Sequence, residues 1–405
     1  MKQITSWAIL RCKFKDQNAE PFPLAFYENL FTAKGAGTLN MTDYFSDVSH
    51  GQLDTTGSAV FGWFTLDLNL ADYHRDTVDL VALGKAAAVA AGVKLASFYG
   101  VVICMNVLCD LYGELGGQAA VCDPGSMEPT VLGQEMGHGY GLDHSRLEGS
   151  ADDYKDRWDT MSTWTDCYYA KHKAYTNVGP GLNAANMDSQ GWLDTARLWQ
   201  SGATGGSTVV LRPLYRRDLP GFLAARLGGY YIELREKKRW DAAIPRPAVL
   251  VHTFDGFRSY LVPAKSGHQD FRKGDVLEVG DARNIFEEHV RIEVTDLDVK
   301  GESATLNVVL RPAFSPPVVG PGTVFGGVSV DGGGWVFLNG HIRRIPPRSP
   351  ELVLVEQALA LRAAAEFSAP VRVRMVREIQ QNLRAITGVA GARPETPPPP
   401  VRQRR

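Results

Sequence analysis

Cysteine is scarce in this 405-residue chain, and none of its five cysteines forms a C-x-x-C pair. So few thiols exclude a small domain framed by disulfides, and the missing pairs count against a cysteine-ligated metal site. We predict buried thiols, with one bridge if the protein is secreted. The five positions are Cys12, Cys104, Cys109, Cys122 and Cys167.

Long apolar segments and runs of one charge are missing as well. No apolar run reaches the roughly 18 residues that a membrane-spanning helix needs. The formal net charge is only −2, and no basic run precedes the short arginine-rich end, so the sequence gives no sign of nucleic-acid binding. The first residues, MKQITSWAILRCKFKDQ, hold too short an apolar stretch for a signal peptide and lack a small-residue cleavage site. Taken at face value, the chain is cytoplasmic.

Hydrophobic residues make up 44% of the chain and charged residues 22%, which allows a substantial core and two or three domains. Up to about residue 200, strand-like segments alternate with helix-like ones. The alanine-rich segment 76–92 is typical of a helix, with Asp76 as its N-cap and Gly92 as its end. This alternation predicts an α/β domain over residues 1–200, built on a mostly parallel sheet. The strand-like segments are 6–16, 61–68 and 99–107.

The pattern changes after residue 200. Strand-like segments separated by Gly, Pro and Asp follow one another through residues 205–312, which predicts an all-β domain. Residues 313–345 read as a Gly/Pro-rich linker with short strands, and residues 346–390 as a helical segment whose apolar positions repeat at helical spacing. The end, residues 391–405, is rich in proline and arginine and is predicted to be disordered.

The segment 131–145, VLGQEMGHGYGLDHS, carries the residues that indicate chemistry. Gln134 and His138 are four residues apart on a predicted helix, so both side chains project from one face and can hold one metal ion. Glu135 follows the first ligand position, where a carboxylate can take a proton from a metal-activated water as a general base. Gly141 allows a sharp turn that brings His144 back as a third ligand.

Downstream, the stretch WDTMS places Met161 where a tight methionine turn would lie. The QExxHxxGxxH form of the zinc motif and this methionine together resemble the metzincin clan of metallopeptidases, and more closely its gametolysin-like members. The resemblance covers roughly residues 1–260, with residues 134–144 and 159–162 as its specific part. It implies an α/β metzincin-like catalytic domain with Met161 beneath the metal. It also implies a secreted metalloendopeptidase whose protein or peptide substrate lies extended along a sheet edge.

Gln134 stands where the zinc motif has its first histidine. An amide oxygen is a weaker and harder donor than an imidazole nitrogen, so metal should bind less strongly. The resemblance implies that glutamine variants occur among gametolysin-like enzymes, so we expect zinc, although a weak three-ligand site can hold copper better. One alternative is a catalytically inactive metzincin-fold binding protein that lost the first ligand. Another is a cell-envelope or carbohydrate-associated β module fused to a degenerate peptidase domain.

Four aspartates crowd the loop after the motif. Such an acidic cluster can bind calcium or shape a cleft, but a solvated loop with caps is commoner, and we favour it. A loop tyrosine more often packs against its neighbours than donates to an oxyanion, so we expect Tyr154 to pack. The aspartates are Asp152, Asp153, Asp156 and Asp159; Trp158 and Trp164 are expected in the core, and His50 and His172 as ordinary histidines.

Overall fold

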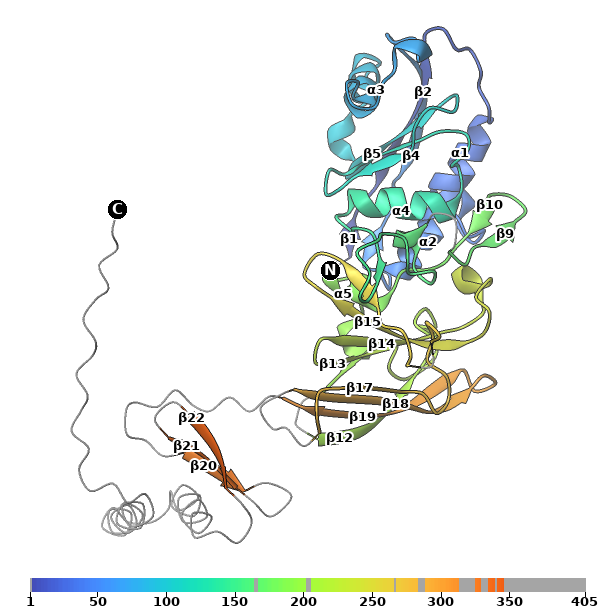
Figure 1. The fold of residues 1–405 in the computed structure, drawn as a ribbon. Coiled ribbons are helices and arrows are strands. Elements are labelled where there is room, and N and C mark those ends of the chain that lie inside the picture. Colours follow the sequence, from blue (N-terminus) through green and yellow to red (C-terminus); the bar gives the residue numbers. More distant parts are fainter. Residues whose placement is uncertain are drawn as a thin grey trace, which may run out of the picture. The chain divides into compact units, whose positions relative to one another are not determined.

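The computed structural model describes residues 2–163, 167–201, 205–265, 267–282 and 288–312, together with three short strands between residues 325 and 345 (Figure 1). Residues 2–281 and 288–312 belong to one compact unit. The three strands belong to a second unit, where β20 (Phe325–Val328), β21 (Gly334–Leu338) and β22 (His341–Ile345) pair antiparallel in that order. The predicted helical segment 346–390, the predicted disordered tail 391–405 and Trp164 lie outside the described residues.

A five-stranded, mostly parallel sheet organises the first part of the large unit. Its order is β4 (Ala59–Leu66), β2 (Trp7–Phe14), β5 (Gly100–Met105), β7 (Ala119–Cys122) and β6 (Tyr112–Glu114). The first four strands run parallel, and β6 pairs antiparallel with β7 at the edge. β2 and β5 are nearly continuous apolar runs because both faces of a parallel sheet are covered. The structure therefore confirms the expected mixed α/β character.

Helices cover both faces of this sheet. Along β5, Val102 and Cys104 face the core that contains α1, α2 and α4, whereas Val101 and Ile103 face α3. This alternation follows from the period of two in a strand, and Figure 1 shows α3 on one side of the sheet and α1 and α4 on the other. The α-helices of the described residues are α1 (Leu24–Phe31), α2 (Met41–Val48), α3 (Leu80–Ala90), α4 (Pro129–Gly139) and α5 (Ala184–Ser189).

Local sequence explains where two of these helices begin. The N-cap of α3 is Asp79 and not Asp76, so that prediction was wrong. The preceding residues form a turn in which amides bond to the His74 carbonyl, and the helix begins only after it. Gly92 has a φ of +85° just past the end of α3, as expected of a helix stop. Pro129 begins α4, where its missing N–H leaves no hydrogen bond unmade.

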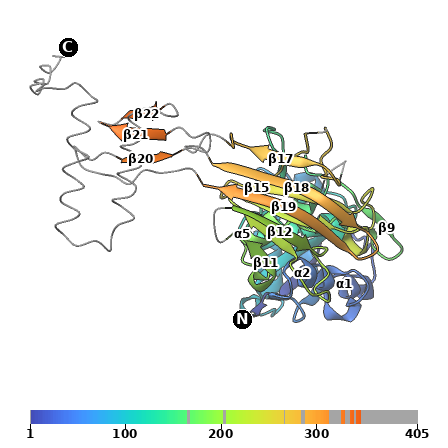
Figure 2. The same ribbon diagram turned by 90° about the horizontal axis from the view of Figure 1, so that it is seen from below.

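Two sheets packed face to face make up the rest of the large unit. The six-stranded sheet has the order β11 (Leu198–Gln200), β13 (Ala224–Leu227), β14 (Tyr230–Arg235), β15 (Ala248–Phe254), β16 (Ser259–Leu261) and β8 (Arg146–Leu147). The four-stranded sheet, whose strands lie side by side in Figure 2, has the order β12 (Gly205–Leu211), β19 (Ser303–Arg311), β18 (His289–Asp298) and β17 (Val276–Val279). Val209, Ile292 and Leu306 of one sheet share a core with Ile232 and Val251 of the other.

Strands are the main regular structure of the described residues between 205 and 312, and their one helical element is η6 (Arg239–Asp241). The change of pattern near residue 205 is not a break in the packing, because β8 and β11 complete the six-stranded sheet from the earlier part. The short elements of the large unit are β1 (Gln3–Ile4) paired with β3 (Leu53–Asp54), β9 (Ala170–His172) paired with β10 (Thr176–Val178), and the 3₁₀ helices η1 (Ala33–Gly35), η2 (Leu70–Asp72), η3 (Leu95–Ser97), η4 (Thr160–Ser162) and η5 (Thr195–Arg197).

All five cysteines are free thiols, and four of them are buried, while Cys109 is partly exposed. The prediction of buried thiols is thus confirmed for four positions. No helix among the described residues is long and apolar enough to cross a membrane.

One buried cation joins the two parts of the large unit. The side chain of Arg235, at the end of β14, is fully buried and pairs with Glu233 and Asp241. Its guanidinium also donates to the carbonyl oxygen of Trp158 at 3.1 Å, and Glu233 accepts the amide proton of Ala184. Because a buried charge must keep its partners, these contacts tie β14 to residues 158–184.

A second contact between the parts uses His50, which follows α2. Its Nε2 lies 2.9 Å from the carbonyl oxygen of Leu214, and its Nδ1 accepts the amide proton of Asp194 at 3.1 Å. Both bonds are made by a neutral ring with its proton on Nε2. Burial lowers the pKa of His50 to about 4, so the ring is neutral at neutral pH and acts as a structural bridge.

We predict that acid weakens the fold through His50. The unfolded chain has a histidine pKa of about 6.5, whereas the folded chain has a pKa of about 4 at His50. The unfolded chain therefore binds the proton first. The stability that depends on a neutral His50 is complete above the unfolded pKa and is lost as the pH falls, by up to about 1.4 kcal/mol per pH unit. Urea unfolding at several pH values between neutral and mildly acidic measures this slope.

The matched variant is His50→Asn, because Asn tolerates the positive φ of +47° at this position. Its unfolding free energy should be lower at neutral pH and should depend less on pH than that of the parent. The other titratable groups remain in both proteins, so the difference between the two slopes isolates His50. Equal slopes would contradict the prediction.

Candidate metal centre

Helix α4 presents three of the predicted site residues in a buried setting. Gln134, Glu135 and His138 are 4%, 5% and 7% exposed. The edge strand β6 packs directly on this helix because Gly113 has no side chain; a Cβ there would overlap the carbonyl oxygen of Glu135. The amide of Gly116 donates to the carbonyl oxygen of His138 at 2.8 Å, which also holds the loop after β6 against α4.

The turn after α4 brings His144 back to the helix, as the spacing predicted. Gly141 has a φ of +99°, a conformation that a Cβ would penalise, and the amide of Leu142 bonds back to the carbonyl of Gly137 at 3.1 Å. The rings of His138 and His144 then lie with their centroids 4.7 Å apart, edge to face. The structure thus places the two predicted imidazole ligands side by side.

The orientation of His138 is fixed by its own backbone. Its Nδ1 lies 2.7 Å from the carbonyl oxygen of Leu142, and because a carbonyl only accepts, Nδ1 carries the proton. The lone pair is therefore on Nε2, the nitrogen that a neutral histidine offers to a metal. Burial, and secondarily the neighbouring His144, lowers the pKa of His138 to about 4, so the ring is in its ligand form at neutral pH.

Gln134 supplies an oxygen with an unmet bonding requirement. Its amide nitrogen donates to Glu135 at 3.3 Å, whereas its amide oxygen is buried and has no hydrogen-bond partner among the described residues. A buried acceptor without a partner costs free energy, so an electropositive group near this atom would be favoured. This oxygen lies on α4 one helical turn before His138, whose ring is next to that of His144, and so fits a metal held by one amide and two imidazoles.

Glu135 has the protonation behaviour of a group that can both take and give a proton. Burial raises the pKa of its carboxyl to about 7, against the lowering effect of the hydrogen bond from Gln134. A carboxyl with a pKa near the working pH suits general acid–base chemistry.

His144 is held by groups that the motif does not contain. Its Nδ1 lies 3.3 Å from Asp153, whose carboxylate also receives Arg146 at 2.7 Å and Arg258 at 3.0 Å. Although burial raises the pKa of Asp153, hydrogen bonds from Arg146 and His144 hold it below its usual range. A carboxylate on the far nitrogen orients a histidine ligand and increases its basicity.

The other ring nitrogen of His144 faces Tyr154. The Tyr154 hydroxyl lies 3.0 Å from Nε2, and the two ring centroids are 4.3 Å apart. Tyr154 therefore contacts the candidate centre and does more than pack against its neighbours. A metal bound through Nε2 would have to replace this contact.

Met161 lies beneath α4. It is fully buried, and a Cβ placed on Gly137 would come within 2.8 Å of its sulfur. The amide of Ser145 donates to the Met161 carbonyl at 3.1 Å, and Asp159 caps the turn by accepting the Met161 amide at 2.7 Å. The turn is thus bonded directly to the residue that follows His144.

The interpretation of the acidic loop was wrong for two of its four aspartates. Asp156 and Asp159 are fully buried, and Asp156 pairs with the equally buried His252 at 2.9 Å. Burial, then the nearby Asp156, raises the pKa of Asp159 to about 7. These aspartates brace the loop from inside. Nowhere in the part of the chain that the structure describes do three His, Cys, Asp or Glu side chains converge to hold a metal, so a metal here depends on Gln134.

Sequence reasoning missed Arg146 and Arg258. Arg258 lies 105 residues beyond Asp153, and it reaches the site because β16 pairs with β8. No local pattern in the sequence marks such a partner.

In comparisons with known proteins, no protein-family model matches the chain, and no curated protein matches it. The functional argument therefore depends on the residues and their geometry.

We predict that Asp153→Asn weakens metal binding. The amide would no longer offer a charged acceptor to His144 and would lose its ion pairs with two arginines, so the apparent Kd for zinc should rise about 10- to 100-fold. Competition with a chromogenic chelator measures this. The control is Asp152→Asn, since Asp152 is 74% exposed and pairs only loosely with Lys155. Equal zinc affinity in the two variants would refute the role of Asp153.

Proposed function

We propose that this chain is a metal-dependent endopeptidase of the metzincin clan, similar to gametolysin-like enzymes, with a QExxHxxGxxH motif. The observation that carries the proposal is the buried, unpartnered oxygen of Gln134, one helical turn from His138 and on the helix beside which His144 returns. The position of Glu135 next to Gln134 on α4, and of Met161 against Gly137 of that helix, also supports the proposal.

The surroundings of α4 also suit a peptide substrate. β6 is an edge strand, and the backbone groups of an edge can pair with an extended chain. Because β6 packs directly on α4, a peptide added to this edge would pass close to Glu135. This supports a protein or peptide as the substrate.

The chain's own residues have separable tasks in this reaction. When bound, zinc or copper would lower the pKa of a water molecule and polarise the peptide carbonyl. Glu135 takes the proton from the attacking water and passes it to the departing amine, two steps that a pKa near 7 allows. Gln134, His138 and His144 form the ligand set, and Asp153 fixes the ring of His144. We propose zinc as the metal, with copper favoured if the amide ligand leaves the site weak.

We predict that Glu135→Ala abolishes cleavage of an unstructured protein such as casein. The lost general base should lower kcat by at least about 100-fold, while zinc affinity changes little because Glu135 is not a ligand. A gel-based cleavage assay with and without chelator, together with metal analysis, tests both parts. Glu148→Gln is the control, since Glu148 is an exposed carboxylate that lies outside the site. Chelator-resistant cleavage that survives Glu135→Ala would rule out this mechanism.

A second prediction concerns the unusual ligand. Gln134→His should lower the Kd for zinc by about tenfold or more, because an imidazole nitrogen binds zinc more strongly than an amide oxygen. Titration of zinc against a competing chelator measures the change. Unchanged affinity would mean that position 134 does not reach the metal.

One observation favours a second candidate, a catalytically inactive metzincin-fold binding protein. Both nitrogens of His144 already have partners, Asp153 on Nδ1 and Tyr154 on Nε2. A parent protein that binds no metal and cleaves nothing, but gains both properties in Gln134→His, would establish this candidate in place of the peptidase.

A further inference from the structure

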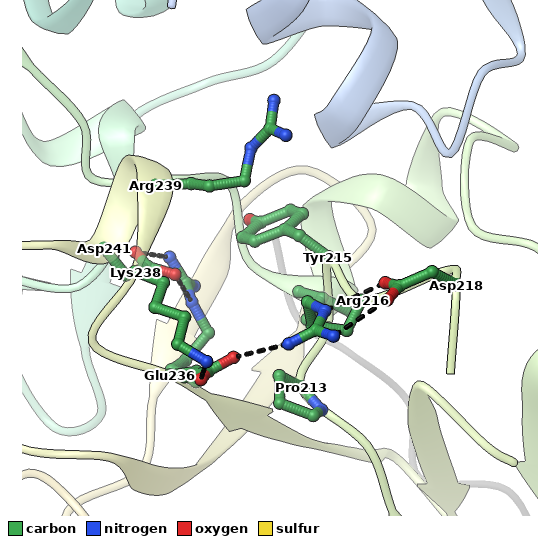
Figure 3. A pocket seen from close by; sticks show the side chains of 10 residues that line it. Pro213, Tyr215, Arg216, Asp218, Glu236, Lys238, Arg239 and Asp241 are labelled. Carbon is green, nitrogen blue, oxygen red and sulfur yellow. Dashed lines mark hydrogen bonds and ion pairs between the residues drawn. The ribbon is translucent and has the colours of Figure 1, made fainter. Parts of the chain in front are cut away.

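A cavity of about 480 Å³ is lined by none of the candidate metal ligands (Figure 3). One wall is the loop of residues 213–218, which follows β12, and the other is formed by residues 235–241, from the end of β14 through η6. Arg239 pairs with Asp47 of α2 at 2.7 Å, and Leu214 accepts a bond from His50. The cavity therefore lies where α2 meets the β part of the unit, a common place for a ligand site.

The cavity combines an apolar floor with a basic rim. Pro213 and Leu214 are buried, and the ring of Tyr215 lies in Figure 3 between Arg239 on one side and the ion pairs around Glu236 on the other. An aromatic ring beside aliphatic side chains can receive the flat apolar body of a small molecule.

The basic side chains of the rim differ in how many of their N–H donors are already bonded. Arg216 gives both of its arms to Asp218 and Glu302, and Lys238 bonds to Glu236 and Glu302.

Arg239, by contrast, is half exposed and makes a single ion pair among the described residues, through one Nη, although a guanidinium carries five N–H donors. Its backbone has a φ of +51°, an uncommon conformation for a residue other than glycine. Arg239 is thus the rim group best able to bind a new acceptor.

We propose that this cavity binds a small organic carboxylate with an aromatic or apolar body. The carboxylate would take the N–H donors of Arg239 that the ion pair with Asp47 leaves free, and the body would lie on Tyr215 and Pro213. The lining holds four cations and three carboxylates, and Asp47, Glu233 and Glu302 pair with those cations from outside it, so the cations are outnumbered. This excess of carboxylates repels a dianion such as phosphate more than a monoanion, and binding therefore depends on the spare donors of Arg239. This site does not depend on peptidase activity.

The wall of the cavity is bonded to the segment beneath the candidate metal centre. Tyr215 donates its hydroxyl to the carbonyl of Leu182, and Asp241 accepts the amide of Gly181. The carbonyl of Gly181 in turn accepts the amide of Thr160, the first residue of the methionine turn. A ligand that orders this wall would therefore stabilise the turn as well.

Titration calorimetry on the full chain tests the proposal with benzoate as the probe. We expect a millimolar Kd, as suits so small a molecule, with acetate and the neutral benzamide each binding about tenfold more weakly or less. Arg239→Gln should weaken benzoate by about tenfold. The control is Arg226→Gln, because Arg226 is also half exposed, pairs with one carboxylate (Asp188) and lies 5.3 Å from the ring of Tyr231, but is outside the cavity.

Three results would overturn the proposal. The first is no detectable binding of benzoate to the parent, and the second is equal binding of benzoate by Arg239→Gln and the parent. The third is tighter binding of inorganic phosphate than of benzoate, which would assign the cavity to simple anions. Comparing benzoate, acetate and benzamide on the parent needs no variant, so the test stands even if Arg239→Gln fails to fold.

Discussion

The buried guanidinium of Arg235 is the interaction on which the rest of the large unit depends. A charge that is cut off from water is tolerated only while its partners stay in place, and removal of one partner from such a pair typically costs about 3–5 kcal/mol. Here Arg235 donates directly to the carbonyl of Trp158, and its partners Asp241 and Glu233 accept the amide protons of Gly181 and Ala184. The methionine turn lies inside that stretch, so a cation from the β part positions the floor of a site built on the α/β part.

The α/β part and the β part therefore share one sheet, and the composition of the sequence does not reveal this. The pattern of the sequence changes near residue 205, but the six-stranded sheet takes one edge strand, β8, from the segment just after His144. That pairing delivers Arg258 to Asp153, and through it to His144. The β part thus contributes one side chain, that of Arg258, to the surroundings of the candidate centre.

Whether a feature could be predicted from the sequence depends on how far apart in the chain its interacting residues lie. The return of His144 after Gly141 depends on a few neighbouring residues, and the spacing predicted it. Helix α1 was not predicted, since it is short and its N-cap, Pro23, has no side chain that can cap. The burial of Asp156 was misjudged because its partner, His252, lies 96 residues away, and no local pattern records that distance. The roles of the site residues remain proposals that rest on geometry.

The close approach of β6 to α4 has a further consequence. Gly113 lets the strand lie directly against the helix, and the hydrogen bond from the Gly116 amide to the His138 carbonyl holds it there, so the edge keeps a fixed offset from Glu135. The hydrogen-bonding groups of a strand repeat every two residues, or about 7 Å. An extended chain paired to this edge can therefore shift only in steps of two residues. The edge would act as a ruler, and fragments cut from one bound stretch would differ in length by even numbers of residues.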